Sequence, residues 1–103
     1  MNTSSLINQI NEALAALGGG PFLTTKTAEE ATKTTVTGTL GDSEIHIEFI
    51  EEGNGTEAEK DHTVVVVDGA SGERLGEGRG DSTFADAISS FGWAGVLDAV
   101  KNG

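Results

Sequence analysis

Residues 35–49 alternate between two kinds of side chain, and this period of two constrains the fold more than any other feature of the chain. One face of the alternation carries Val36, Gly38, Leu40, Ile45, Ile47 and Phe49, and the other carries Thr35, Thr37, Thr39, Glu44, His46 and Glu48. Successive side chains of a strand point to opposite faces of a sheet. The central pair Gly41-Asp42 suits a two-residue turn, because glycine readily adopts positive φ. The segment therefore predicts an antiparallel hairpin with one buried face and one solvent-exposed face.

A third strand is predicted over residues 62–68, HTVVVVD. Four consecutive valines are typical of a central or well-covered strand. A short fourth strand around residues 73–75 can follow the turn DGASG. Residues 22–33 show no clean period and are predicted to form a linker or an irregular turn.

Two segments have helical spacing. Leu6, Ile7, Ile10, Leu14 and Leu17 lie three or four residues apart, which predicts a helix over residues 4–17. Thr3, Ser4 or Ser5 can cap its start, and the run Gly-Gly-Gly-Pro at 18–21 ends it. The second segment has apolar residues at Phe84, Ile88, Phe91, Trp93, Val96, Leu97 and Val100. We expect Asp81 or Ser82 to cap it, and either a bend near Gly92 or two short helices.

The predicted fold class is α+β, as one domain over residues 1–103 with the order α-β-β-β-α. A three-stranded antiparallel sheet, with the short fourth strand as an option, would bury both helices on one of its faces. The glycine-rich stretch LGEGRGDST at 75–83 follows a predicted strand and leads into a predicted helix, as phosphate-binding loops do. Glu77 and Asp81 would place negative charge where the phosphate sits, so a flexible connector with a helix cap is the better interpretation.

The net charge of the chain indicates which class of partner it can bind. Seventeen acids against six bases give a formal net charge of −11. Such a surface repels nucleic acids and anionic membranes and attracts basic protein surfaces, although high charge also simply keeps proteins in solution. The chain has no cysteine, and neither a signal-peptide pattern nor a membrane-length apolar run is present, so we expect a cytoplasmic protein.

The sequence offers little for catalysis. His46 and His62 are the only histidines, no nucleophile-elbow motif is present, and few aromatic residues are available to build a pocket. The oxygen-rich stretch EEGNGTE lacks the ligand spacing of an EF-hand. We therefore expect a protein that is not an enzyme, with neither a cofactor nor a dedicated metal site.

The acids are concentrated in residues 42–61, where eight acids against one base leave a net charge of −7. The candidate partner-binding residues are Asp42, Glu44, Glu48, Glu51, Glu52, Glu57, Glu59 and Asp61. A solvated hairpin is the usual meaning of such a run. Clustering on one hairpin makes a binding role comparably plausible, because carboxylates along a strand can stand in for the phosphates of DNA.

Three features together resemble the small acidic type II-A anti-CRISPR proteins of phages: the opening MNTSSLINQI, the acidic strands that follow and the closing segment DSTFADAISSFGWAGV. The resemblance implies an α/β inhibitor that occupies the PAM-reading site of an RNA-guided nuclease as a DNA mimic, where arginines read the major groove. The inhibitory acids would then correspond to those between Glu48 and Asp61, with Asp42 and Glu44 as further candidates.

The leading hypothesis is therefore an acidic, protein-binding inhibitor of a nucleic-acid-handling protein, without direct nucleic-acid or membrane binding. The alternative is a small interaction module or homodimer with the α-β-β-β-α order of double-stranded-RNA-binding domains. The basic start of the closing helix in those domains is replaced here by Asp81-Ser82-Thr83, so RNA binding would be lost. Monomer and homodimer both stay open.

Overall fold

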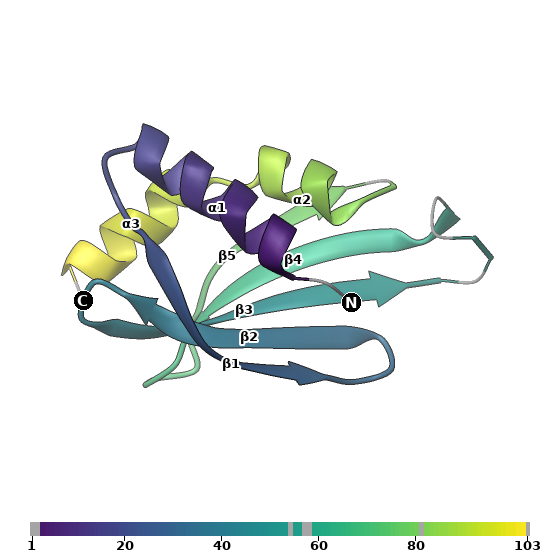
Figure 1. Ribbon diagram of the computed structural model, residues 1–103, viewed down its shortest axis with the longest axis horizontal. Coiled ribbons are helices and arrows are strands. Elements are labelled where there is room, and N and C mark those ends of the chain that lie inside the picture. Colours follow the sequence, from purple (N-terminus) through teal and green to yellow (C-terminus); the bar gives the residue numbers. More distant parts are fainter. Residues whose placement is uncertain (1–2, 54, 57–58, 81, 103) are drawn as a thin grey trace.

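The computed structural model describes residues 3–53, 55–56, 59–80 and 82–102 (Figure 1). Three helices and five strands follow one another along the chain. In order they are α1 (Ser4–Ala16), β1 (Phe22–Glu29), β2 (Lys33–Leu40), β3 (Ser43–Glu52), β4 (Asp61–Asp68), β5 (Arg74–Gly80), α2 (Phe84–Ser90) and α3 (Trp93–Asn102).

The five strands form one antiparallel meander with the order β1-β2-β3-β4-β5. The predicted hairpin of β2 and β3 is confirmed, with Leu40 opposite Ser43 and Gly41 at a φ of 65° in the turn. The valine strand is confirmed as β4, which pairs with β3 on one side and β5 on the other. Because every connection is a hairpin, alternate turns lie at opposite ends of the sheet.

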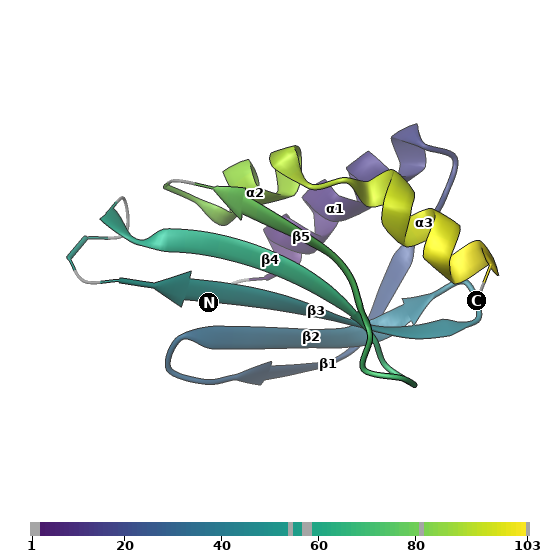
Figure 2. The ribbon, with the colours of Figure 1, turned by 180° about the vertical axis from the view of Figure 1, so that it is seen from behind.

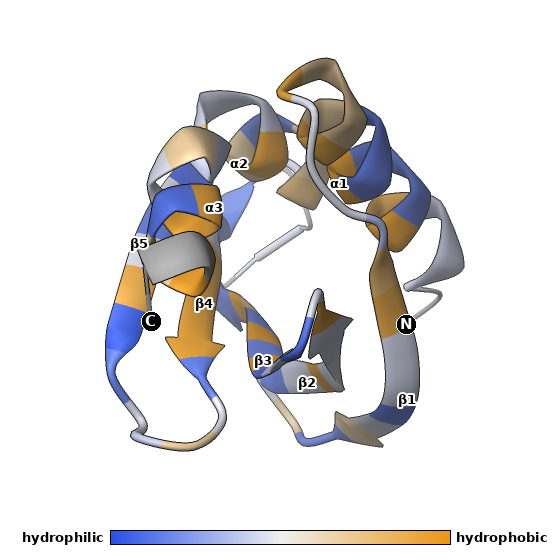
Figure 3. Cartoon of the chain, turned by 90° about the vertical axis from the view of Figure 1, so that its left-hand side faces the viewer, coloured by the Kyte–Doolittle hydropathy of each residue, from blue (hydrophilic) through white to orange (hydrophobic). Residues whose placement is uncertain are grey.

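The three helices lie on one face of the sheet, and the sheet curves so that its edge strands rise on either side of them (Figures 1 and 3). Apolar side chains from both layers meet between them. The core includes Ile7, Ile10 and Leu14 of α1, Phe84, Ala87 and Ile88 of α2, Val36, Ile45, Ile47, Phe49, Val64 and Val66 of the sheet, and Trp93 and Val96 of α3. The helix-free face carries the predicted polar residues from Thr35 to Glu48, which are half-buried or exposed.

The predicted order α-β-β-β-α is wrong, because the sheet has five strands and the chain ends in two helices. Residues 22–29, predicted as a linker, form the edge strand β1. Only Phe22 of this strand is buried, and the next seven residues are exposed. A strand exposed on both faces has no alternating apolar pattern, so its threonines are its main strand signal.

The second error concerns residues 75–80, predicted as a flexible connector after a short strand. They form β5, which extends over Arg74–Gly80. Gly76, Gly78 and Gly80 face the helices, and a Cβ atom at Gly78 would lie 2.5 Å from the carbonyl oxygen of Ala87. Glycine at every second position therefore lets α2 lie directly on the strand backbone.

The closing segment forms two helices, one of the two predicted outcomes, with Phe91 and Gly92 between them. Thr83 caps α2, since its hydroxyl accepts a hydrogen bond from the Asp86 N–H at 3.1 Å. Ser82 is thus not the cap, and Asp81 lies outside the described residues. Thr3 is the N-cap residue of α1 but makes no side-chain cap hydrogen bond. None of the helices in the described part of the chain has the length and apolar character needed to cross a membrane.

Candidate functional site: the acidic end of the sheet

The predicted acids do not lie on one continuous surface. Asp42 and Glu44 lie at the β2–β3 turn, whereas Glu51, Glu52, Glu59 and Asp61 lie at the opposite end, around the β3–β4 connection. Figures 1 and 2 show these two turns at opposite ends of the molecule. Glu48 lies between them on the helix-free face, and Glu57 is outside the described residues.

The helix-free face of the sheet has mixed charge. Glu48 lies 3.8 Å from the Lys33 ammonium, and Glu44 lies 3.4 Å from His46. Glu77 of β5 is within 4.0 Å of both Arg74 and Arg79. The middle of this face is therefore a network of acids and bases rather than a run of carboxylates.

Six acids gather at the other end, which we name the acidic end. They are Glu29, Glu30, Glu51, Glu52, Glu59 and Asp61, and the described bases near them are Lys33, Lys60 and Arg79, which lies opposite Thr63 on β5. The β1–β2 turn contributes the first two, because β1 and β2 bring that turn to the same end as the β3–β4 connection (Figure 2). Sequence reasoning missed Glu29 and Glu30 because it placed them in a linker; recognising β1 as a strand would have found them.

Glu52 and Asp61 are direct cross-strand partners at the tip of β3 and β4, and both are exposed. Like charges directly opposite each other destabilise a sheet. Exposed Glu59 lies in the connection between them and accepts a hydrogen bond from the Thr56 hydroxyl at 3.2 Å. Electrostatic repulsion between exposed carboxylates is therefore expected at the outer surface of the acidic end.

Glu51 differs from these acids because it points to the helix side of the sheet. One of its carboxylate oxygens is 3.1 Å from the Lys60 ammonium, and the other is 3.4 Å from Nε2 of His62. The His62 side chain is fully buried and packs edge-on against Phe84, with ring centroids 4.8 Å apart. The two histidines thus differ in environment, because His46 is half-buried on the helix-free face.

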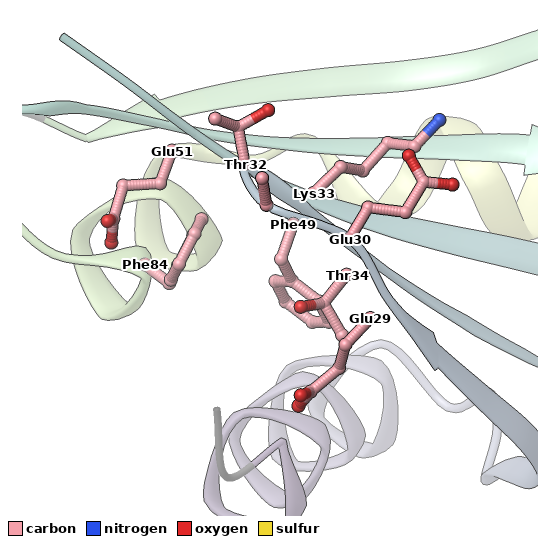
Figure 4. A pocket seen from close by; sticks show the side chains of 9 residues that line it. Glu29, Glu30, Thr32, Lys33, Thr34, Phe49, Glu51 and Phe84 are labelled. Atoms are coloured by element: carbon pink, nitrogen blue, oxygen red, sulfur yellow. The ribbon is translucent and has the colours of Figure 1, made fainter.

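A pocket of about 400 Å³ opens beside Glu51 (Figure 4). Its lining consists of Glu29, Glu30, Ala31, Thr32, Lys33, Thr34, Phe49, Glu51 and Phe84. The Glu51 N–H donates to the Thr32 carbonyl at 2.9 Å, which fixes the β1–β2 turn against the end of β3. Phe49 and Phe84 meet edge to face with centroids 5.5 Å apart. The acidic end thus combines an exposed carboxylate tip with a pocket that has aromatic and acidic walls.

The chain was compared with protein-family models, with curated proteins and with solved structures, and none of the three comparisons yields a match.

Proposed function

We propose that this chain is a protein-binding inhibitor that places its acidic end on the basic, nucleic-acid-binding surface of another protein. One observation carries the proposal: Glu52 and Asp61 are held directly opposite each other and exposed. A like-charge pair of this kind lowers the stability of the free protein. Arginines or lysines of a partner would relieve the repulsion through charge-assisted hydrogen bonds.

The rest of the acidic end supports the same function. Glu59 extends the carboxylate surface along the connection, and Glu30 adds a further exposed carboxylate from the neighbouring turn. A net charge of −11 on the chain would also accelerate association with a basic surface, by an amount that falls as salt rises. A surface that binds DNA phosphates is such a target, so the inhibitor would act as a DNA mimic.

The partner class we propose is an RNA-guided nuclease of type II-A, with the acidic end in its PAM-reading groove. This choice rests on the short stretches that resemble anti-CRISPR proteins. The order of helices and strands no longer supports it, because the sheet has five strands rather than three. The mechanism needs only binding: a groove filled with carboxylates cannot receive duplex DNA.

The experiment is a competition assay with the nuclease loaded with guide RNA. The protein should inhibit cleavage of a PAM-containing duplex, and saturation of the nuclease with that duplex should prevent binding of the protein. The apparent affinity should fall steeply with salt, as expected for interfaces dominated by exposed charges. Binding that is undiminished by saturating duplex would rule out mimicry, and absence of both binding and inhibition would rule out this partner.

A further inference from the structure

The pocket beside Glu51 has an aromatic inner wall and carboxylates in its lining. Together these suit a cationic group that carries an apolar stem. Phe49 and Phe84 are almost fully buried, so their ring edges close the inner side of the pocket. Glu29, Glu30 and Glu51 contribute three carboxylates to the lining. Figure 4 shows the Glu51 side chain beside Phe84 and that of Glu29 across the Phe49 ring.

Two bases lie near these carboxylates: Lys33 in the lining, and Lys60, which pairs with Glu51. The Lys33 ammonium pairs with Glu48 on the other face of the sheet at 3.8 Å, and Figure 4 shows its side chain directed away from Phe49. The Glu51 carboxylate is held in place by Lys60 at 3.1 Å and by His62 at 3.4 Å. Since each carboxylate oxygen has two lone pairs, a carboxylate held in this way can receive a further donor with little loss of conformational entropy.

We infer that this pocket is a binding site for a single alkylguanidinium group, the end of an arginine side chain. Its volume of about 400 Å³ lies within the range of small-ligand sites. The planar head would donate to the Glu51 carboxylate, and the alkyl stem would pack against Phe84 and the turn residue Thr32.

The arginine is supplied by the basic partner, and in this respect the inference rests on the proposed function. The exposed tip at Glu52 and Asp61 would meet the surface of the partner, while the pocket receives one projecting side chain. An anchor of this kind turns general charge attraction into a defined orientation, because arginine is typical of the few residues that dominate an interface.

The pocket can be tested without a partner. Butylguanidinium, a monocation that reproduces the end of an arginine side chain, is titrated into the isotope-labelled protein while amide shifts are followed by NMR. We expect saturable shifts at Thr32, Phe49 and Phe84, with a dissociation constant on the order of 1 mM or weaker for so small a ligand. Guanidinium without the alkyl stem should bind more weakly.

Two matched pairs of variants separate the pocket from general charge. Ala31→Trp blocks the mouth of the pocket, whereas Ala28→Trp places the same exposed ring on the helix-free face of β1, opposite Thr35. Glu51→Gln removes a carboxylate inside the pocket, and Glu52→Gln removes the neighbouring one outside it. Ala31→Trp should weaken binding at least about tenfold because the indole ring blocks the pocket, and Glu51→Gln about tenfold because one charge-assisted contact is lost. The second member of each pair should leave binding within about twofold.

Absence of saturable shifts, or equal losses for Glu51→Gln and Glu52→Gln, would overturn the inference. Ala31→Trp keeps the test valid if Glu51→Gln unfolds, because Ala31 is exposed. Failure of the proposed function would look different. Butylguanidinium would still bind the pocket in that case, while the competition assay with the nuclease would show neither inhibition nor binding.

Discussion

Glycine positions in this chain show how one atom decides which elements can pack together. Gly76, Gly78 and Gly80 of β5 lie under α2 and the residues next to it, with no room for a Cβ atom. Gly95, within α3, has open space around it. The same residue type thus has opposite consequences for stability at the two sites.

Gly78→Ala should lower the free energy of unfolding by about 1–3 kcal/mol, since the new methyl group would overlap the Ala87 carbonyl and force α2 away from β5. Gly95→Ala should raise it by up to about 1 kcal/mol, because alanine favours the helical backbone. Urea denaturation of both variants measures this. A stable Gly78→Ala would show that α2 does not lie directly on β5.

His62 gives the second prediction at this scale. Its side chain is fully buried between Glu51 and Phe84, whereas that of His46 is one-third exposed. His62→Ala should destabilise the protein by about 2–4 kcal/mol, through a cavity at the end of the core. His46→Ala should change stability by less than about 0.5 kcal/mol. Equal effects in thermal or urea unfolding would contradict this assignment of the two histidines.

Among the elements, β1 depends on an anchor from α1. The Asn11 side chain accepts a hydrogen bond from the Phe22 N–H at 2.8 Å and donates to the Phe22 carbonyl at 3.2 Å. Both backbone groups of the first residue in β1 are therefore paired with one amide. This contact joins the helix layer to the outer edge of the sheet.

Asn11→Ala should lower the free energy of unfolding by about 1–3 kcal/mol, because it removes the hydrogen-bond partner of the backbone N–H and carbonyl of Phe22. Hydrogen exchange at the Phe22 amide should accelerate more than exchange at β3 and β4 amides, since the edge strand opens locally. Glu12→Ala, at the exposed neighbouring position, is the control. Unchanged exchange at Phe22 would show that β1 is held by its pairing with β2 alone.

The elements also show what could be predicted from sequence. The β2–β3 hairpin, the valine strand and α1 have apolar periods, since each buries one or both faces, and all three were predicted with nearly correct bounds. β1 was missed because an edge strand with two exposed faces leaves no apolar period. β5 was mistaken for a connector because its packing signal is the glycine spacing, which also occurs in loops.

The candidate site, too, was predicted only in part. The acids of residues 42–61 were predicted as one cluster from their density in the sequence, but Asp42 and Glu44 lie at the opposite end of the sheet from the others. Their partition into an exposed tip, led by Glu52 and Asp61, and a pocket wall at Glu51 could not be predicted without the register of β3 and β4. Glu29 and Glu30 joined the site only through the unpredicted β1. Whether these acids bind a partner stays a prediction.

For the whole molecule, a net charge of −11 on a chain whose longest extent is 41 Å predicts self-repulsion in the folded state. Raising NaCl from about 10 mM to about 500 mM shortens the screening length from roughly 30 Å to about 4 Å. The free energy of unfolding should then rise by about 1 kcal/mol, measured by urea denaturation at each salt concentration. A decrease would mean that ion pairs such as Lys60–Glu51 outweigh the repulsion.

The central claim is that the acidic end, rather than negative charge in general, binds the basic partner. Two triple variants change the net charge equally: Glu52→Lys, Glu59→Lys and Asp61→Lys at the acidic end, and Asp42→Lys, Glu44→Lys and Glu73→Lys at the other. All six positions are exposed. Glu51 is left unchanged because Lys60 and the buried His62 depend on it.

Titration calorimetry with the guide-loaded nuclease measures the binding of both variants directly. We predict that the acidic-end variant binds at least about a hundredfold more weakly than the unchanged protein, because three charge-assisted contacts become repulsive. The opposite-end variant should bind within about threefold of it, apart from a slower association. Equal losses in the two variants, or no binding by the unchanged protein, would contradict the claim.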